Sequence, residues 1–385
     1  MTPTIDAVLG DTLERLRGLD LGDTFDPRAA EAILDAGLQR LVVPAEAGGL
    51  GASMADAAEV LAAIGAVDGA TALGFAMQVH VLGALRDAPH VPGAIRADVF
   101  RAVVGEGAFV NNAATEEGGG SPARGAIPGT VARLDGGTWR LTGEKTWTTW
   151  LPNLAFAFVS ARIDAGKGRR GGAGPKPEVA SFLVDLSLDG ITRLHGFEAM
   201  GMRGSASGRL ELDDVRVPAD AILVRRRADE PDPRGAIPGA WFAAALAATY
   251  LGVGEGARSA VARWALDRRP GDGKTSVAEV PSVQVRLGRL DADLRAARIV
   301  LLDAARRYDE ARETADLTLA KLVCTRAAAT ATDEALRIAG GPGFLAGHLE
   351  RAFRDARAGL INPPLEDVAL TSFAAAVLER ERSAG

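Results

Sequence analysis

Two adjacent prolines and two adjacent acids lie close together near the end of the chain, in the stretch RDARAGLINPPLEDVAL (354–370). Proline lacks an N–H and fixes its own φ, so Pro363 and Pro364 end the preceding helix and hold the backbone rigid. A carboxylate beside such a turn could act as a general base, which makes Glu366 a candidate catalytic residue. In the alternative interpretation, Glu366 and Asp367 are the acidic first turn of a last helix, where the helix dipole favours negative charge.

Glycines and hydroxyls occur together in ATEEGGGSP, residues 114–122. Consecutive glycines allow a backbone to approach a ligand closely, and the hydroxyls of Thr115 and Ser121 can hydrogen-bond to it. The alternative is an ordinary turn. A second glycine cluster, IAGGPGF (338–344), either receives a ligand in the same way or only ends the helix before it.

The stretch GEKTWTTW, residues 143–150, alternates like a β-strand. With a period of two residues, Lys145, Trp147 and Thr149 would lie on one face. A wide aromatic ring beside a hydroxyl can hold a flat heterocycle, with the rings in contact and the hydroxyl bonded to a ring acceptor. The alternative is that both tryptophans of this stretch belong to a β core.

Three regions of different periodicity would position these residues. Residues 1–108 have the apolar spacing of helices, with Asp26 as a helix N-cap and Pro27 as the first helical residue. Residues 109–225 contain short alternating stretches separated by turns, which predicts a β domain, either a barrel or a sandwich. Residues 226–385 return to the helical period over about four long segments, which predicts an antiparallel bundle. The expected fold class is thus α+β and multidomain.

The composition excludes several kinds of function. The net charge of −6 gives no general attraction to nucleic acid. One cysteine and four scattered histidines have no metal-ligand spacing, and the single Cys324 suits a reducing compartment such as the cytoplasm. We identify no apolar run of about 18 residues, so we expect no membrane span.

Taken together, the motifs resemble those of the acyl-CoA dehydrogenase family over nearly the whole chain. EAGGLGAS resembles the family's GGxG turn, ATEEGGGSP its flavin loop, GEKTWTTW its GxKxWxTN strand, MGMRGSAS its LGMRxSxT segment, and IAGGPGF with RDAR its closing element. The resemblance implies N-terminal helices, a middle β domain and a C-terminal four-helix bundle. It also implies FAD, an acyl-CoA or related substrate, electron transfer to an electron-transfer flavoprotein or another acceptor, and a homodimer or homotetramer.

Residue by residue, the resemblance implies which positions meet the FAD. The residues at its isoalloxazine ring and phosphates would be Thr115, Gly120, Ser121, Trp147 and Thr149. Arg268 matches an arginine that contacts the FAD of a neighbouring subunit. The loop over the adenine-side phosphates would comprise Gly340, Gly341 and Gly343.

The resemblance fails at the catalytic base. The family's reaction is α,β-dehydrogenation of an acyl-CoA thioester, in which a glutamate removes the α proton and flavin N5 takes the β hydride. At the usual glutamate position this chain has Pro363, and at the alternative position it has Phe242. Three interpretations follow: a dehydrogenase whose base is relocated to Glu366, a monooxygenase that uses reduced flavin and O2, and a flavin-binding subunit without catalysis.

Overall fold

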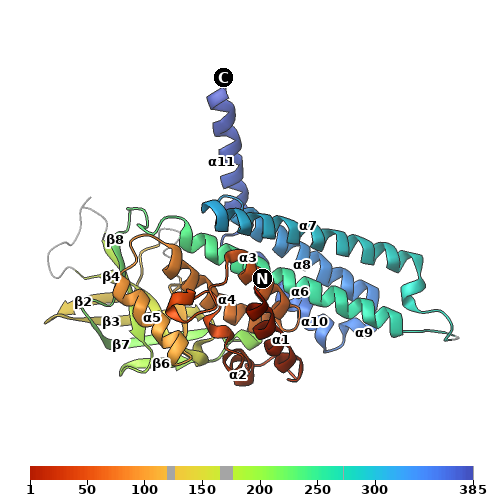
Figure 1. The fold of residues 1–385 in the computed structure, drawn as a ribbon, viewed down its shortest axis with the longest axis horizontal. Helices are drawn as coiled ribbons and strands as arrows, with labels where there is room; N and C mark the ends of the chain where they lie inside the picture. The colour runs from red at the N-terminus through yellow and green to blue at the C-terminus, as the bar shows by residue number, and fades with distance from the viewer. Residues whose placement is uncertain (119–125, 165–176, 272, 385) are drawn as a thin grey trace.

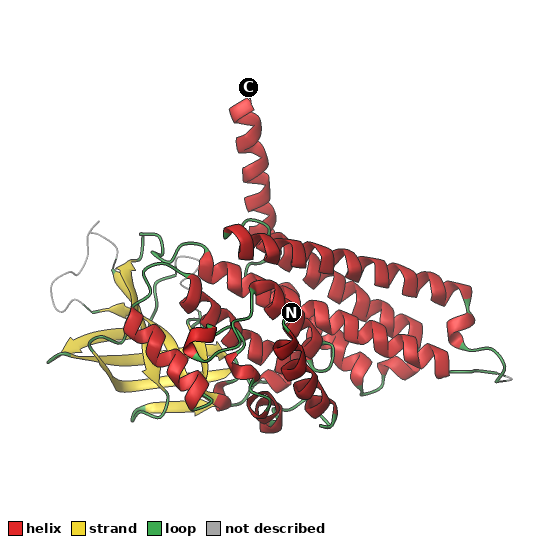
Figure 2. Cartoon of the chain, in the orientation of Figure 1, coloured by secondary structure: helices red, strands yellow, loops and turns green. Residues whose placement is uncertain are grey.

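The fold described here is a computed structural model that covers residues 1–118, 126–164, 177–271 and 273–384. Helices form the first and last parts of the chain and strands form the middle part, as the fold class predicts. The strands gather at one end of the molecule, and the long helices of the C-terminal part extend to the other end (Figures 1 and 2).

The N-terminal part consists of five helices: α1 (Pro3–Arg17), α2 (Pro27–Asp35), α3 (Met54–Gly65), α4 (Gly69–Asp87) and α5 (Gly93–Gly105). The predicted start of α2 is confirmed, since the side chain of Asp26 accepts a hydrogen bond from the N–H of Arg28. Helix α4 is buried on almost every side, between the sheet and the C-terminal bundle. Glycines allow its close packing, because a Cβ on Gly74 would lie 2.2 Å from the ring of Trp150.

The β domain is one mixed sheet of eight strands. Its order is β6-β7-β3-β2-β4-β5-β8, and β1 pairs in parallel with β4. The strands are β1 (Phe109–Ala113), β2 (Val131–Asp135), β3 (Thr138–Thr148), β4 (Leu154–Ile163), β5 (Glu178–Asp185), β6 (Ile191–Leu194), β7 (Gly208–Pro218) and β8 (Ile222–Arg227). Strand β8 therefore ends two residues beyond the predicted boundary at 225.

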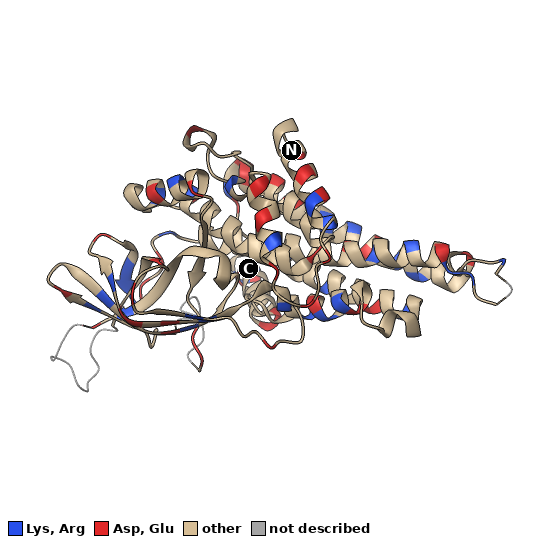
Figure 3. Cartoon of the chain, turned by 90° about the horizontal axis from the view of Figure 1, so that it is seen from below, with Lys and Arg blue, Asp and Glu red and all other residues tan. Residues whose placement is uncertain are grey.

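The C-terminal part contains α6 (Ile237–Asp267), α7 (Pro281–Ala311), α8 (Leu317–Ala339), α9 (Gly341–Phe344), α10 (His348–Ile361) and α11 (Glu366–Ala384). Helices α6, α7, α8 and α10 form the bundle, and α6 also packs against α3 and α4. Helix α11 projects away from the body (Figure 1). Acidic and basic residues are interspersed along the helices and strands (Figure 3).

Helix α6 is the core helix of the bundle, and it is apolar enough to test the expectation about membrane spans. By length and composition alone its most apolar window could cross a bilayer, although no such run was identified from the sequence. In the fold, however, 78% of that window is buried. The apolar residues of α6 are thus accounted for by packing against the helices around it.

Candidate functional site

Strand β3 is irregular at the point where the sequence predicts simple alternation. Its register with β7 shifts between Lys145 and Thr148, and Trp147 has a φ of 57°. Lys145 is fully buried, whereas Trp147 is 57% exposed. The prediction that Lys145, Trp147 and Thr149 share one face is therefore wrong, because a bulge turns the indole out of the sheet. The alternative that both tryptophans lie in the core is wrong for Trp147 and correct for Trp150.

The indole of Trp147 packs against one other aromatic ring among the described residues. The ring of Phe197 meets it edge-on, with centroids 5.5 Å apart and an interplanar angle of 78°. A large aromatic surface in a left-handed conformation is uncommon outside functional sites, since the conformation costs free energy. The exposed indole is the first component of the candidate site.

Thr115 follows β1 and is hydrogen-bonded to the residue of β3 that precedes Trp147. Its carbonyl accepts a hydrogen bond from the N–H of Thr146, at 2.9 Å. The adjoining Glu116 is fixed by Lys145, whose Nζ donates to its Oε1 at 2.5 Å, and by the hydroxyl of Thr130 at 2.7 Å. Burial would raise the pKa of Glu116, but these hydrogen bonds outweigh it and lower the pKa. Gly120 and Ser121, which follow in the same loop, lie outside the described residues.

A chain of hydroxyls begins at Thr149, just after β3. Its Oγ1 lies 2.9 Å from the Oγ of Ser207, which lies 2.8 Å from the Oγ of Ser205. The carbonyl of Thr149 accepts a hydrogen bond from Asn111 Nδ2 at 3.0 Å. The segment 205–207 belongs to the predicted MGMRGSAS motif, so the structure brings this motif and GEKTWTTW together.

The sequence did not single out His80 and Asn112, a buried imidazole and a half-buried amide that form a polar pair close to these groups. Asn112 follows Asn111 on β1, and its Nδ2 lies 3.1 Å from Nε2 of His80 on α4. Burial lowers the pKa of His80 to about 4, so its imidazole is neutral at pH 7. The imidazole also meets the ring of Phe242, with centroids 5.1 Å apart. A neutral imidazole bonded to an amide thus lies against Phe242, the residue that the resemblance assigns to the alternative base position. No local sequence pattern could have revealed this pairing across 32 residues.

The link between α10 and α11 contains Pro363, the residue that the resemblance assigns to the family's usual base position. Asn362 Nδ2 donates to the hydroxyl of Tyr250 at 3.1 Å, and this anchors the link to α6. Glu366 points elsewhere: its carboxylate accepts hydrogen bonds from the guanidinium of Arg326, one of them at 3.1 Å, on an exposed surface. The hydrogen bond from Arg326 lowers the pKa of Glu366. This is the arrangement of the alternative interpretation, an acid in the first turn of α11; a catalytic role for Glu366 stays a prediction.

The RDAR motif joins the bundle to the other two parts of the chain. Arg354 Nη2 pairs with Asp23 at 2.6 Å, and its Nη1 donates to the carbonyl of Met200 at 3.0 Å. Asp355 accepts a hydrogen bond from the N–H of Met202 at 2.5 Å. Burial raises the pKa of Asp355 to about 6. The motif therefore fixes where α10 lies against the β domain, and this determines where the Pro363 link begins.

The remaining residues implied by the resemblance lie farther away. Arg268 caps the end of α6, which is the end of the bundle remote from the sheet (Figure 1). Gly340 links α8 to α9 and Gly341 begins α9, and both lie on open surface, since a Cβ on either would have no atom within 4 Å. Gly343 differs, because a Cβ there would lie 2.8 Å from that of Ala339. Within one chain the structure does not bring Arg268 to Trp147.

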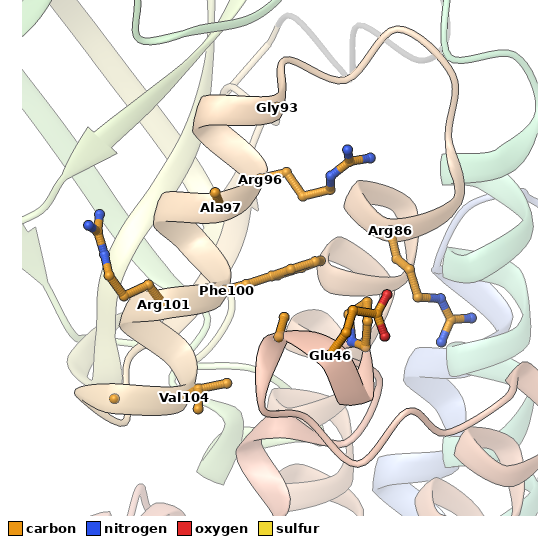
Figure 4. Close-up of a pocket in the computed structure, with 11 residues that line it drawn as sticks. Glu46, Arg86, Gly93, Arg96, Ala97, Phe100, Arg101 and Val104 are labelled. Carbon is orange, nitrogen blue, oxygen red and sulfur yellow. The ribbon is translucent and has the colours of Figure 1, made fainter.

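A groove of about 730 Å³ lies elsewhere, between α5 and the short turn at Ala45–Ala47 (Figure 4). Its lining includes Glu46, Arg86, Arg96 and Phe100. Arg86 holds neighbouring segments together, because Nη1 donates to the carbonyl of Ala52 at 2.7 Å and Nε pairs with Asp87 at 2.8 Å. None of the sequence-predicted site residues that the structure describes lines this groove. Over the described ranges, no group of three or more His, Cys, Asp and Glu side chains could hold a metal ion.

Comparisons with known proteins agree with the geometry. The chain matches the acyl-CoA dehydrogenase middle domain over residues 111–215 and the acyl-CoA dehydrogenase C-terminal domain over residues 240–363. It is 32% identical over 363 residues to the putative acyl-CoA dehydrogenase YdbM of Bacillus subtilis (strain 168), covering 92% of this chain and 90% of that protein.

Two solved structures extend the comparison. The structure is similar to that of KijD3 in complex with FMN and dTDP-3-amino-2,3,6-trideoxy-4-keto-3-methyl-D-glucose, at 26% identity and a TM-score of 0.82, covering 98% of this chain and 95% of that one. Its fold also matches butyryl-CoA dehydrogenase from Megasphaera elsdenii, at 20% identity and a TM-score of 0.83, covering 98% and 99%.

Proposed function

Because the chain belongs to the acyl-CoA dehydrogenase family, whose members bind flavin, we propose that it is a flavin-dependent monooxygenase acting on a small organic substrate. The observation that carries the proposal is Pro363, which occupies the family's base position and has no group that can accept a proton. The next acid along the chain, Glu366, is paired with Arg326 on an exposed surface. Oxygenation needs no carboxylate to remove an α proton, so this arrangement suits it better than dehydrogenation.

Other carboxylates around the site have partners of their own. Glu116 is bonded to Lys145, Glu255 of α6 is bonded to Arg298, and Asp355 accepts the N–H of Met202; these carboxylates support the fold. The alternative base position holds Phe242, packed on neutral His80. The polar groups supplied there are an imidazole and an amide, which can hydrogen-bond a neutral substrate without ionising it.

The residues present fit a flavin. Trp147 offers an exposed indole, Thr149 offers a hydroxyl two residues further along the chain, and the open backbone at Gly340 and Gly341 can approach phosphates closely. Trp147 would contact the ring system, while Thr115 and Thr149 would bond to its polar edge. Bound and reduced, the flavin would supply the two electrons with which O2 gives one oxygen atom to the substrate and the other to water.

The flavin we propose is FAD, and we propose that a second subunit completes its site. The adenine half of FAD requires contacts that FMN does not, and Gly340, Gly341 and Arg268 are the residues that the family's pattern assigns to them. Arg268 is exposed at the far end of the bundle, so it would serve a neighbouring subunit of a homodimer or homotetramer. Helix α11 supports assembly, because it packs on its own chain through little more than Ala369 while Leu370, Val377 and Leu378 are exposed.

The deciding experiment is an anaerobic titration of the purified flavoprotein with short, branched and long acyl-CoAs, followed by the flavin absorbance. We expect no bleaching with any of them. In a second arm, a flavin reductase with NADH reduces the flavin, isotopically labelled O2 is admitted, and candidate substrates are screened by mass spectrometry. One labelled oxygen atom in a product supports the proposal; bleaching by an acyl-CoA in the first arm contradicts it.

A second candidate is acyl-CoA dehydrogenation with Glu366 as the relocated base and an electron-transfer flavoprotein or other acceptor as the partner. The observation that favours it is the 32% identity to a protein named as a putative acyl-CoA dehydrogenase. It requires Glu366 to leave Arg326 and reach the substrate Cα. Under this candidate, Glu366→Gln abolishes bleaching by an acyl-CoA and leaves flavin binding unchanged, whereas Arg326→Met leaves bleaching intact.

A further inference from the structure

One buried lysine of α8 is hydrogen-bonded to the backbone of the link between α10 and α11. Lys321 is only 3% exposed, and its Nζ donates to three backbone carbonyls. The acceptors are Gly359 at 2.9 Å, Asn362 at 2.7 Å and Pro364 at 3.1 Å. These three carbonyls bracket Pro363, so Lys321 contacts the backbone on both sides of the residue that replaces the family's base.

The chemistry of the link explains why a side chain is needed there. Pro363 and Pro364 have no N–H, so the turn cannot be closed by the usual backbone hydrogen bonds. The last carbonyls of α10 also lack partners within their own helix. An ammonium group has three N–H donors and no acceptor, so three carbonyls use all of its hydrogen-bonding capacity.

Neighbouring side chains also hold this link in place by a hydrogen bond and by close packing. The hydroxyl of Tyr250, fully buried on α6, accepts the hydrogen bond from Asn362. A Cβ on Gly359 would lie 2.9 Å from Tyr250 and 3.0 Å from Thr325, so glycine is what allows α10 to come this close. Helices α6, α8 and α10 therefore define the course of the link together, with Lys321 as the only cation among these contacts.

We propose that Lys321 is a positioning residue that fixes the course of Asn362–Pro364 and thereby shapes the wall of the flavin site at the former base position. The hydrogen bonds are independent of the reaction; only the statement that this wall faces the flavin rests on the proposed function. Lys321 touches no reacting atom in this role. It acts through the backbone it holds, so its loss changes the shape and mobility of the wall.

Hydrogen exchange of the link tests the first half of the proposal. Lys321→Met removes all three donors, and Lys321→Gln keeps two N–H groups. Arg326→Met is the matched control, because it breaks the Glu366 pair on the same helix and leaves the three carbonyl bonds in place. We expect exchange of the amides of Ile361 and Asn362 to rise at least tenfold in the Met variant, to rise less in the Gln variant, and to stay within twofold in the control.

Two results would overturn this half. One is exchange of the link within twofold of the parent in Lys321→Met; the other is an equal rise throughout α6, α8 and β3, which would mean general loosening. If Lys321→Met does not fold, the Gln variant and Tyr250→Phe give the same comparison. Tyr250→Phe removes only the acceptor of Asn362 and should raise exchange of the link without affecting α8.

The visible circular dichroism of bound flavin tests the second half. We expect the band to change in Lys321→Met and Lys321→Gln and to be preserved in Arg326→Met. Faster exchange with an unchanged flavin band would show that the link does not face the flavin and would overturn that half. Because neither readout measures turnover, a failure to detect oxygenation would contradict the proposed function and leave the assignment of Lys321 standing.

Discussion

Replacing Trp147 by alanine should weaken flavin binding by a predictable amount. An indole presents roughly 200 Å² to its surroundings, and 57% of Trp147 is exposed, so a flavin ring could cover about 100 Å² of it. At about 25 cal/mol per Å² this contact is worth roughly 2.5 kcal/mol. Since about 1.4 kcal/mol corresponds to a factor of ten, Trp147→Ala should raise the Kd for flavin roughly 60-fold.

The assay is a titration of the apoprotein with FAD and with FMN, followed by quenching of flavin fluorescence. Trp147→Phe keeps a smaller ring and should lose roughly tenfold, since about half of the contact area remains. Leu134→Ala is the matched control: Leu134 is an apolar side chain of β2 in the same domain, 53% exposed and outside the proposed site. It should leave both dissociation constants unchanged.

One result would refute this reasoning. If Trp147→Ala binds flavin within threefold of the parent while its thermal unfolding is unchanged, the indole does not contact the ring. Equal losses in Trp147→Ala and Leu134→Ala would point instead to a general effect on the sheet. A loss confined to FAD, with FMN unaffected, would place Trp147 at the adenine half.

Three further predictions concern stability and assembly. The pKa of Asp355 is raised to about 6, so the contribution of this carboxyl to stability falls as pH rises from about 4 to 6. Asparagine does not ionise, so Asp355→Asn should be more stable than the parent by ~3 kcal/mol at pH 7 and equal to it near pH 4. Urea unfolding measures both values. The pKa of His80 is lowered to about 4, so its effect runs the other way: stability is lost as pH falls from about 6.5 to 4. Glutamine does not titrate, so the free energy of unfolding of His80→Gln should fall by ~3 kcal/mol less than that of the parent over this pH range, in the same assay. Removing α11 from Glu366 onward should lower the oligomeric mass in light scattering, because an isolated helix that buries little more than Ala369 needs a partner to cover its apolar side chains.

Each of these predictions has a contrary outcome. A constant difference between Asp355→Asn and the parent over pH 4–7 would mean that the carboxyl is not shifted by burial. A His80→Gln variant that loses as much stability in acid as the parent would locate that loss elsewhere. An unchanged mass after removal of α11 would mean that other surfaces hold the subunits together, such as α7 with its exposed Ile299.

Much of the fold was readable from the sequence, because its signals are local. The N-cap at Asp26 was predicted correctly because a short acidic side chain and the following proline act on backbone groups within three residues of them. The change from helical period to alternation identified the β domain, since strands and helices bury side chains at different intervals. The glycine clusters and the paired prolines also marked turns, because their effect on φ does not depend on distant residues.

The site was decided by tertiary structure. The bulge at Trp147 depends on the register of β3 with β7, about 60 residues away. Because of the bulge, Trp147 is exposed while Lys145, which simple alternation would place on the same face, is buried. His80 and Asn112 meet across two elements, and Glu366 is paired with Arg326 of α8, 40 residues earlier. Which carboxylate has a partner, and which is free to act as a base, is set by packing between elements. The sequence therefore determined the family and the fold class; only the packing of α6, α8 and α10 decided which groups surround Pro363, because electrostatic and hydrogen-bond partners are fixed by distance in space.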